Sequence, residues 1–150
     1  MRIALAFALS ILITGAALAE EGQEIFVRNC AMCHQTGAGG LAGQFPRLAG
    51  RVGPISSTPD GRTYLIDVLT IGLSGQIIVD NKPIIGMMPP FPGLTDDKIA
   101  AVLNYLRSLG KATGPDVTAD EITQVRAASR KSPGDIMKER KALVETKVIP

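Results

Sequence analysis

Two cysteines and a histidine stand close together near the N-terminal end of the chain, as Cys30, Cys33 and His34 in a Cys-x-x-Cys-His run. Positions i, i+3 and i+4 of a helix share one face, so these side chains can reach the same flat ligand. Two thiols can add across the vinyl groups of a porphyrin, and an imidazole beside them can bind its iron. The spacing therefore predicts the covalent attachment of one haem c. The chain has only these two cysteines, which leaves none for a disulfide.

Cys30 and Cys33 have two other interpretations, a redox-active dithiol and a zinc site. A dithiol motif favours the N-terminus of a helix, where the helix dipole lowers a thiol pKa. Here a helix predicted from Glu21 to Asn29 runs into the motif from its N-terminal side, and no βαβ pattern surrounds it. A zinc site needs four ligands, whereas the cysteines and the only histidine supply three. A thiol–disulfide oxidoreductase stays as an alternative function.

A second iron ligand is expected from the segment Gly86-Met87-Met88-Pro89-Pro90-Phe91. A haem iron held by histidine and methionine suits electron transfer, because the thioether raises the reduction potential. Proline holds the residue before it in an extended conformation, which fixes the position of that side chain. Met88 directly precedes Pro89, and we predict it as the axial ligand opposite the histidine. Met87 is the alternative.

Filled axial positions decide what the iron could do. With His34 and Met88 both bound, a substrate has no open coordination site, and single-electron transfer remains. If Met88 does not bind iron, the open site would instead indicate a haem enzyme or a gas sensor. The two remaining internal methionines, Met32 and Met137, are predicted to be packing residues.

The N-terminus has the pattern of a secretory signal peptide. Arg2 precedes an apolar run from Ile3 to Leu18, and Ala17-Leu18-Ala19 forms an A-x-A cleavage site. We predict a signal peptide over residues 1–19, cleavage after Ala19 and a periplasmic protein. This agrees with the attachment of c-type haem outside the cytoplasm. The alternative is that this segment stays uncleaved. Only in that case do we expect the protein to associate with a membrane.

The composition of the mature chain limits the number of domains and the kinds of partner that we expect. Removal of residues 1–19, which include Arg2, from the 150 leaves 131 residues with 15 basic and 14 acidic side chains. This length predicts one domain. No block of like charges occurs, so nucleic acid is not an expected partner. Aromatic residues make up 4% of the chain and tryptophan is absent, so a buried porphyrin would supply the missing apolar surface.

The mature chain is predicted to consist of short helices joined by glycine- and proline-rich loops, an all-α fold without a sheet of any size. The segment from Ile77 to Ile85 fits a small hairpin or a compact loop, and Thr36 to Gly53 is predicted to be a loop. Helix signals, in the form of caps and apolar residues at helical spacing, occur from Glu21 to Asn29, from the Thr58 cap to Gly72, and from Thr95 to Gly110.

About 40 residues follow Gly110, and they contain two further helix signals. Thr118 and Glu121 are spaced as a capping box, and a second helix is predicted from Ser132. The apolar contacts expected on them are Ile122, Val125, Ile136, Met137, Leu143 and Val144. Two interpretations stay open: packing of this extension on its own domain, or an arm that docks on a larger redox subunit. The predicted organisation is a signal peptide over 1–19, a haem-binding domain over 20–112 and a helical extension over 113–150.

From Gly22 to Leu109 the sequence resembles the class I c-type cytochromes, particularly small bacterial periplasmic ones. Gly22 and Phe26 stand where that family packs its first helix against its last, whose apolar set is matched by Val102, Tyr105 and Leu106. Pro46-Arg47-Leu48-Ala49-Gly50 resembles the family's P-x-L-x-G loop. In the family, the carbonyl oxygen of this proline accepts a hydrogen bond from Nδ1 of the iron-binding histidine. Met88-Pro89-Pro90-Phe91 matches the distal loop.

The resemblance implies the class I cytochrome c fold around one covalently bound haem and outer-sphere transfer of single electrons, not an enzyme. Arg51 follows the Pro46 loop, and it either pairs with a haem propionate or is a surface arginine. Arg47, Arg62 and Lys82 are expected around the exposed haem edge. The predicted cofactor-binding residues are Cys30, Cys33, His34, Pro46, Leu48, Arg51, Met88 and Phe91, of which His34 and Met88 bind the metal.

The segment from Asp60 to Met88 looks like a version seen in cytochromes that serve periplasmic dehydrogenases. The expected partners are therefore redox proteins, with a periplasmic dehydrogenase as electron donor and a terminal oxidase or another cytochrome as acceptor. The protein would act either as a soluble carrier or as the electron-accepting subunit of such a dehydrogenase.

Overall fold

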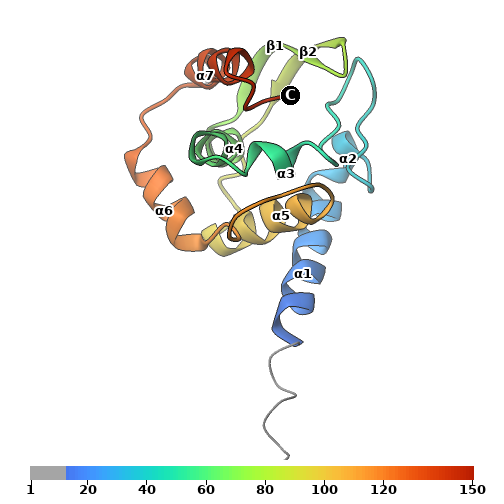
Figure 1. The fold of residues 1–150 in the computed structure, drawn as a ribbon, viewed down its shortest axis with the longest axis vertical. Helices are drawn as coiled ribbons and strands as arrows, with labels where there is room; N and C mark the ends of the chain where they lie inside the picture. The colour runs from blue at the N-terminus through green and yellow to red at the C-terminus, as the bar shows by residue number, and fades with distance from the viewer. Residues whose placement is uncertain (1–12) are drawn as a thin grey trace, which may run out of the picture.

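The computed structural model describes residues 13–150, and its elements are mainly helical (Figure 1). In chain order they are α1 (Ile13–Asn29), α2 (Ala31–His34), α3 (Val52–Ile55), α4 (Pro59–Ile71), β1 (Leu73–Val79), β2 (Lys82–Met88), α5 (Asp96–Ser108), α6 (Ala119–Ala128) and α7 (Pro133–Glu145). Most of the predicted signal peptide lies outside the described residues. Between residues 13 and 150, no helix is long and apolar enough to cross a membrane.

The first helix is longer than predicted, because α1 begins at Ile13 and continues through Ala19 to Asn29. The other predicted helices agree closely with α4 and α5. The Thr58 cap is confirmed, since its hydroxyl accepts a hydrogen bond from the backbone N–H of Gly61 at 3.1 Å. Pro59 follows it in the first turn, where its missing N–H has no intrahelical partner to lose.

α1 packs against α5 through the residues that the resemblance indicated. A Cβ atom at Gly22 would collide with the carbonyl oxygen of Ala101 and lie 2.9 Å from Cβ of Tyr105, so the two backbones approach closely. One helical turn further along, Phe26 is fully buried, and its ring centroid lies 5.5 Å from that of Tyr105. This contact holds the end of α1, and the cysteine motif that follows it, against the core.

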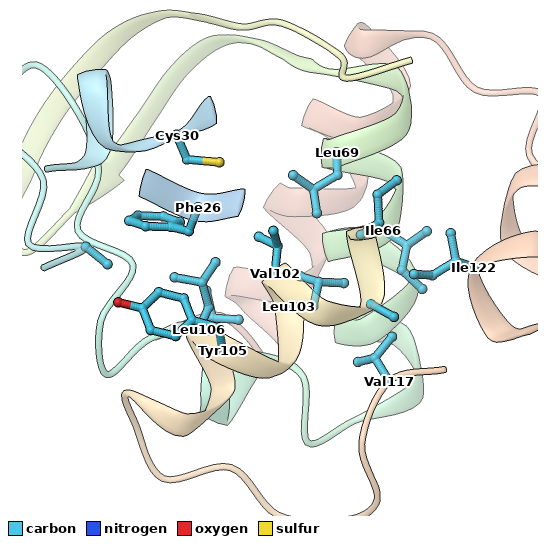
Figure 2. Packing of buried hydrophobic residues seen from close by; sticks show 14 residues of the cluster. Phe26, Cys30, Ile66, Leu69, Val102, Leu103, Tyr105, Leu106, Val117 and Ile122 are labelled. Carbon is cyan, nitrogen blue, oxygen red and sulfur yellow. The ribbon is translucent and has the colours of Figure 1, made fainter. Parts of the chain in front are cut away.

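Figure 2 shows the main core, in which α4 lies beside α5 and the side chains of Ile66 and Leu69 point toward Val102 and Leu103. Ile122 of α6 closes the same cluster from the far side. A second apolar cluster joins the other face of α4 to β1 and α7. The helix α4 is therefore buried between two cores.

The small hairpin predicted as one possibility from Ile77 to Ile85 is confirmed and is longer than predicted. β1 and β2 form a two-stranded antiparallel sheet in which Leu73 pairs with Met88 and Val79 with Lys82. Asp80 and Asn81 form its two-residue turn, with φ values of 49° and 59° that suit a type I′ turn. Glycines and a proline weaken the strand signal in the sequence, whereas α7 packs on β1 and supports the pairing.

The C-terminal extension packs on its own domain. α6 contacts α4 and α5, and α7 contacts α4 and β1. Ile122 and Ile136 are fully buried, and Leu143 is nearly so. Met137 packs against the second core as predicted, but Val144 is 46% exposed and was wrongly expected to make an apolar contact.

The caps of these two helices differ. Ser132 and Asp135 form both hydrogen bonds of a capping box at the start of α7. Thr118 caps α6, since its hydroxyl accepts a hydrogen bond from the N–H of Glu121 at 3.2 Å, and the Glu121 carboxylate accepts a hydrogen bond from Arg62 at 2.8 Å. The placement of Arg62 at an exposed haem edge was therefore wrong, because this residue joins α4 to α6.

We expect Gly22→Ala to lower the free energy of unfolding by about 1–3 kcal/mol, the usual cost of an overpacked contact between helices. Gly39→Ala is the matched control, since a methyl group there meets no atom within 4 Å. Unfolding of both variants in denaturant gives the comparison. Equal stability of the two variants would contradict the close contact between α1 and α5.

Candidate functional site

The cysteine motif lies at the junction of α1 and the short helix α2. The N–H of His34 donates to the carbonyl oxygen of Cys30 at 2.9 Å, so the backbone stays helical through the motif. Cys30 is buried and Cys33 is half-buried, and neither takes part in a disulfide. The helical spacing brings all three chemically competent side chains to the wall of one cavity.

That cavity has a volume of about 560 Å³, within the range of small-molecule sites. Its wall consists of the cysteine motif, the loop before Pro46, both strands of the hairpin and the segment after β2. A smaller cavity of about 90 Å³ adjoins it, and the lining residues common to both are His34, Pro46, Leu73, Ile77 and Met88. A mostly apolar space of this size, bordered by two thiols, an imidazole and a thioether, fits a flat macrocycle with a central metal.

The imidazole of His34 is buried and held by one hydrogen bond. Its Nδ1 lies 2.9 Å from the carbonyl oxygen of Pro46, the partner that the family resemblance implied. Because a carbonyl only accepts, Nδ1 carries the proton and Nε2 keeps its lone pair. Burial lowers the pKa of His34, against the opposing effect of this hydrogen bond. The ring is thus a neutral base whose free nitrogen can bind a metal.

The Cys30 thiol does not have the lowered pKa of a reactive cysteine. Burial, followed by the charge of Cys33, raises the pKa of Cys30 to about 11. Attack on a disulfide requires a thiolate, and reactive dithiols have lowered pKa values. In the described part of the chain, no group of three His, Cys, Asp or Glu side chains is arranged to hold a metal ion.

Met88 and Met87 are neighbours on β2 and differ in burial. Met88 is half-buried, lines both cavities and packs against both cores. Met87 is 76% exposed and borders only the larger cavity. Met32 is 89% exposed, so the prediction that it packs in the interior was wrong. It lies at the border of the cavity instead.

The remaining predicted site residues lie around the same space. Phe91 lines the larger cavity. Its N–H donates a hydrogen bond to the carbonyl oxygen of Leu69 in α4 at 2.9 Å. Leu48 lines the smaller cavity. Arg51 also lines it and is only 7% exposed, so the surface-arginine interpretation was wrong. Its guanidinium donates to the carbonyl oxygen of Pro150 at 2.6 Å.

An ion pair joins the hairpin turn to the loop that carries Pro46. Arg47 donates to both carboxylate oxygens of Asp80, at 2.9 and 2.8 Å, and Arg51 lies 3.6 Å from the same group. The Arg47 hydrogen bond lowers the pKa of Asp80 below its usual value of 3.8. The hairpin ends in Met88, and the carbonyl oxygen of Pro46 in the loop holds His34, so this contact connects the segment that carries Met88 to the loop that supports His34.

The smaller cavity is also lined by three residues that were not predicted to belong to the site: Tyr64, Arg140 and Ile149. Tyr64 lies at the spacing of the apolar residues on α4, so the sequence predicts only a core residue and gives no sign that its hydroxyl faces a cavity. Arg140 and Ile149 belong to the extension, and no local pattern places them near His34.

Residues 19–110 match the family model for cytochrome c. The chain belongs to the cytochrome c family. It is accordingly an electron-transfer protein that carries covalently attached haem c, and Cys30 and Cys33 fit the attachment motif. The fold, mostly helical with one small sheet, agrees with that of the class I members.

The chain is similar over nearly its whole length to a cytochrome c-552 of Thermus thermophilus, with 41% identity over 139 residues, 89% of this chain and 93% of the relative. It is also similar to the cytochrome c subunit of a quinone-dependent alcohol dehydrogenase from Gluconacetobacter polyoxogenes, with 32% identity over 78% of this chain and 25% of that subunit. The fructose dehydrogenase cytochrome subunit of Gluconobacter japonicus is 31% identical over 75% of this chain and 23% of its own length.

We expect Asp80→Asn to destabilise the protein at pH 7 by about 0.2–1 kcal/mol, the range of an exposed ion pair. Asparagine keeps the turn, because it tolerates positive φ. The pKa of Asp80 is lowered in the folded state, so its contribution is present above pH 3.8 and is lost as the pH falls through the folded-state value. Denaturant unfolding at pH 7 and below pH 3.8 measures this difference.

A double-mutant cycle with Arg47→Gln isolates the ion pair. In that background the Asp80 substitution should have little further effect. An equal loss of stability in both backgrounds would show that the carboxylate acts through another contact.

Proposed function

We propose that this cytochrome c is a monohaem periplasmic protein that transfers single electrons by an outer-sphere route, as a soluble carrier or as the electron-accepting subunit of a periplasmic dehydrogenase. The observation that carries the proposal is the position of His34 and Met88. These residues are far apart in the sequence, yet both line the two adjoining cavities, with Cys30 and Cys33 in the wall of the larger one.

Each residue of the site has a definite role in this proposal. Cys30 and Cys33 would hold the cofactor by thioether bonds, and His34 and Met88 would bind its iron. Bound haem c supplies the exchange of one electron between Fe(III) and Fe(II). Pro46 fixes the imidazole of His34 through the Nδ1 hydrogen bond.

Two axial protein ligands leave no coordination position for a substrate, which supports electron transfer over a haem enzyme or gas sensor. Leu48 and Phe91 keep water from the pocket by supplying apolar wall. Arg51 binds a propionate, a role that its burial beside the cavity supports. Exposed apolar side chains, Met32, Ile85 and Met87, border the larger cavity and give its open side an uncharged rim for contact with a redox partner.

The proposed location and partners rest on the signal-peptide pattern and on the dehydrogenase cytochrome subunits among the relatives. We place residues 1–19 as the signal peptide, 20–112 as the cytochrome c domain and 113–150 as the extension. The donor is a periplasmic dehydrogenase, and the acceptor is a terminal oxidase or another cytochrome. The apolar faces of α6 and α7 are buried against α4, α5 and β1, which favours packing of the extension over a docking arm.

Covalent attachment is tested on a denaturing gel stained for haem. The wild-type protein, expressed with a haem-attachment system, should keep its stain, whereas a protein with noncovalent haem on the same gel should lose it. The double variant Cys30→Ala/Cys33→Ala should also lose the stain, because no thioether can form. A stained band for the double variant would refute the proposed attachment.

The two methionines are separated by the visible spectrum of the ferric protein. Met88→Ala should abolish the weak red charge-transfer band of a methionine–iron bond and lower the reduction potential, because the thioether favours Fe(II). Met87→Ala should preserve both, since that side chain is mainly in solvent. The reverse pattern would assign the ligand to Met87. Retention of the band in both variants would show that neither methionine is the iron ligand.

A further inference from the structure

Two buried arginines face the smaller cavity from opposite ends of the sequence. Arg51 precedes α3, whereas Arg140 comes from α7 in the extension, and they are 7% and 5% exposed. Tyr64 of α4 lies in the same wall and is also buried. This cavity shares His34 and Met88 with the larger one, so the three polar side chains lie at the inner end of the haem site.

The protein neutralises the positive charge at this place only in part. Arg140 donates one long hydrogen bond, 3.3 Å, to the carbonyl oxygen of Ile78. Arg51 donates to the C-terminal oxygen of Pro150 at 2.6 Å and lies 3.6 Å from the Asp80 carboxylate, which already accepts two hydrogen bonds from Arg47. Burial lowers the pKa of Arg51, the charge of Asp80 opposes this effect, and the charge of Arg140 adds to it. Buried guanidinium groups of this kind require an anion.

Tyr64 adds a neutral hydrogen-bond donor. Burial raises its pKa to about 12, against the opposing effect of Arg140. The charged groups that act on this cluster from the surrounding elements are Arg47, Asp80 and Glu139. A hydroxyl and two guanidinium groups around an apolar space match carboxylates, because arginine binds carboxylate with two parallel hydrogen bonds.

We propose that Arg140 and Tyr64, together with Arg51, bind the haem propionates, so that the C-terminal extension completes the cofactor site. The inference rests on the proposed function, since it requires haem in the adjoining cavities. It assigns two residues and a segment that the cytochrome motifs do not include.

The extension has the contacts needed to hold Arg140 in place. Ile136 and Leu143, on the same helix, are buried in the second core. Ile149 lines the smaller cavity, and the carbonyl oxygen of Pro150 positions the guanidinium of Arg51. The extension therefore supplies one cation directly and orients another.

The test uses holoprotein variants and two measurements, the reduction potential and the propionate bending modes in the resonance Raman spectrum. Arg140→Gln should lower the potential, because a positive charge near the iron disfavours Fe(III). It should also shift a propionate mode, since a hydrogen bond to the carboxylate is lost. Arg140→Lys should restore part of the potential. Lys141→Gln removes a charge from an exposed neighbour on the same helix and should change neither quantity.

Tyr64→Phe provides an independent variant if Arg140→Gln does not accumulate as holoprotein. It keeps the buried ring and removes only the hydroxyl, so the potential should fall by less and a propionate mode should again shift. The inference is overturned if both variants keep the wild-type potential and Raman modes, even when they unfold more easily. A wild-type protein without covalent haem or without a methionine–iron band would overturn the proposed function instead.

Discussion

The close contact between α1 and α5 is the constraint on which the rest of the structure depends. Gly22 has no Cβ atom to separate the two backbones, and Phe26 lies against Tyr105 one turn later. Since Cys30 follows Phe26 by four residues, the contact sets the position of the motif relative to the core (Figure 2). The N–H of Cys30 donates to the carbonyl oxygen of Phe26 at 2.8 Å, and the side chains of Cys30, Cys33 and His34 line the cavity.

The opposite wall of the cavity is built from a hairpin that has little stability of its own. A two-stranded sheet is marginal in water unless other elements cover it. Here α7 packs on β1, and Arg47 binds the turn through Asp80. These contacts determine where β2 ends, and Met88 is its last residue. The position of the candidate distal ligand thus depends on a helix and a loop from other parts of the chain.

The C-terminal extension belongs to the same unit as the cofactor site. It contributes Ile122 to the main core and Ile136, Leu143 and Ile149 to the second one. Figure 1 shows α7 lying beside the hairpin, with the C-terminus returning toward α3. Because α4 is enclosed by both cores, the extension stabilises the helix that carries Tyr64. A segment that looked separable in the sequence is therefore continuous with the wall of the cavity.

The sequence by itself determined the features that depend on local spacing. The attachment motif, the caps at Thr58 and Ser132, and the approximate bounds of α4 and α5 all follow from residues a few positions apart. The choice of Gly22 and Phe26 as contact residues came from the family resemblance. The tertiary structure decided what depends on distant partners. Arg140 reaches Ile78 across 62 positions and Arg51 reaches Pro150 across 99, and no periodic pattern encodes such contacts. The hairpin belongs to this second group, because its weak strand signal becomes a sheet only where α7 covers it.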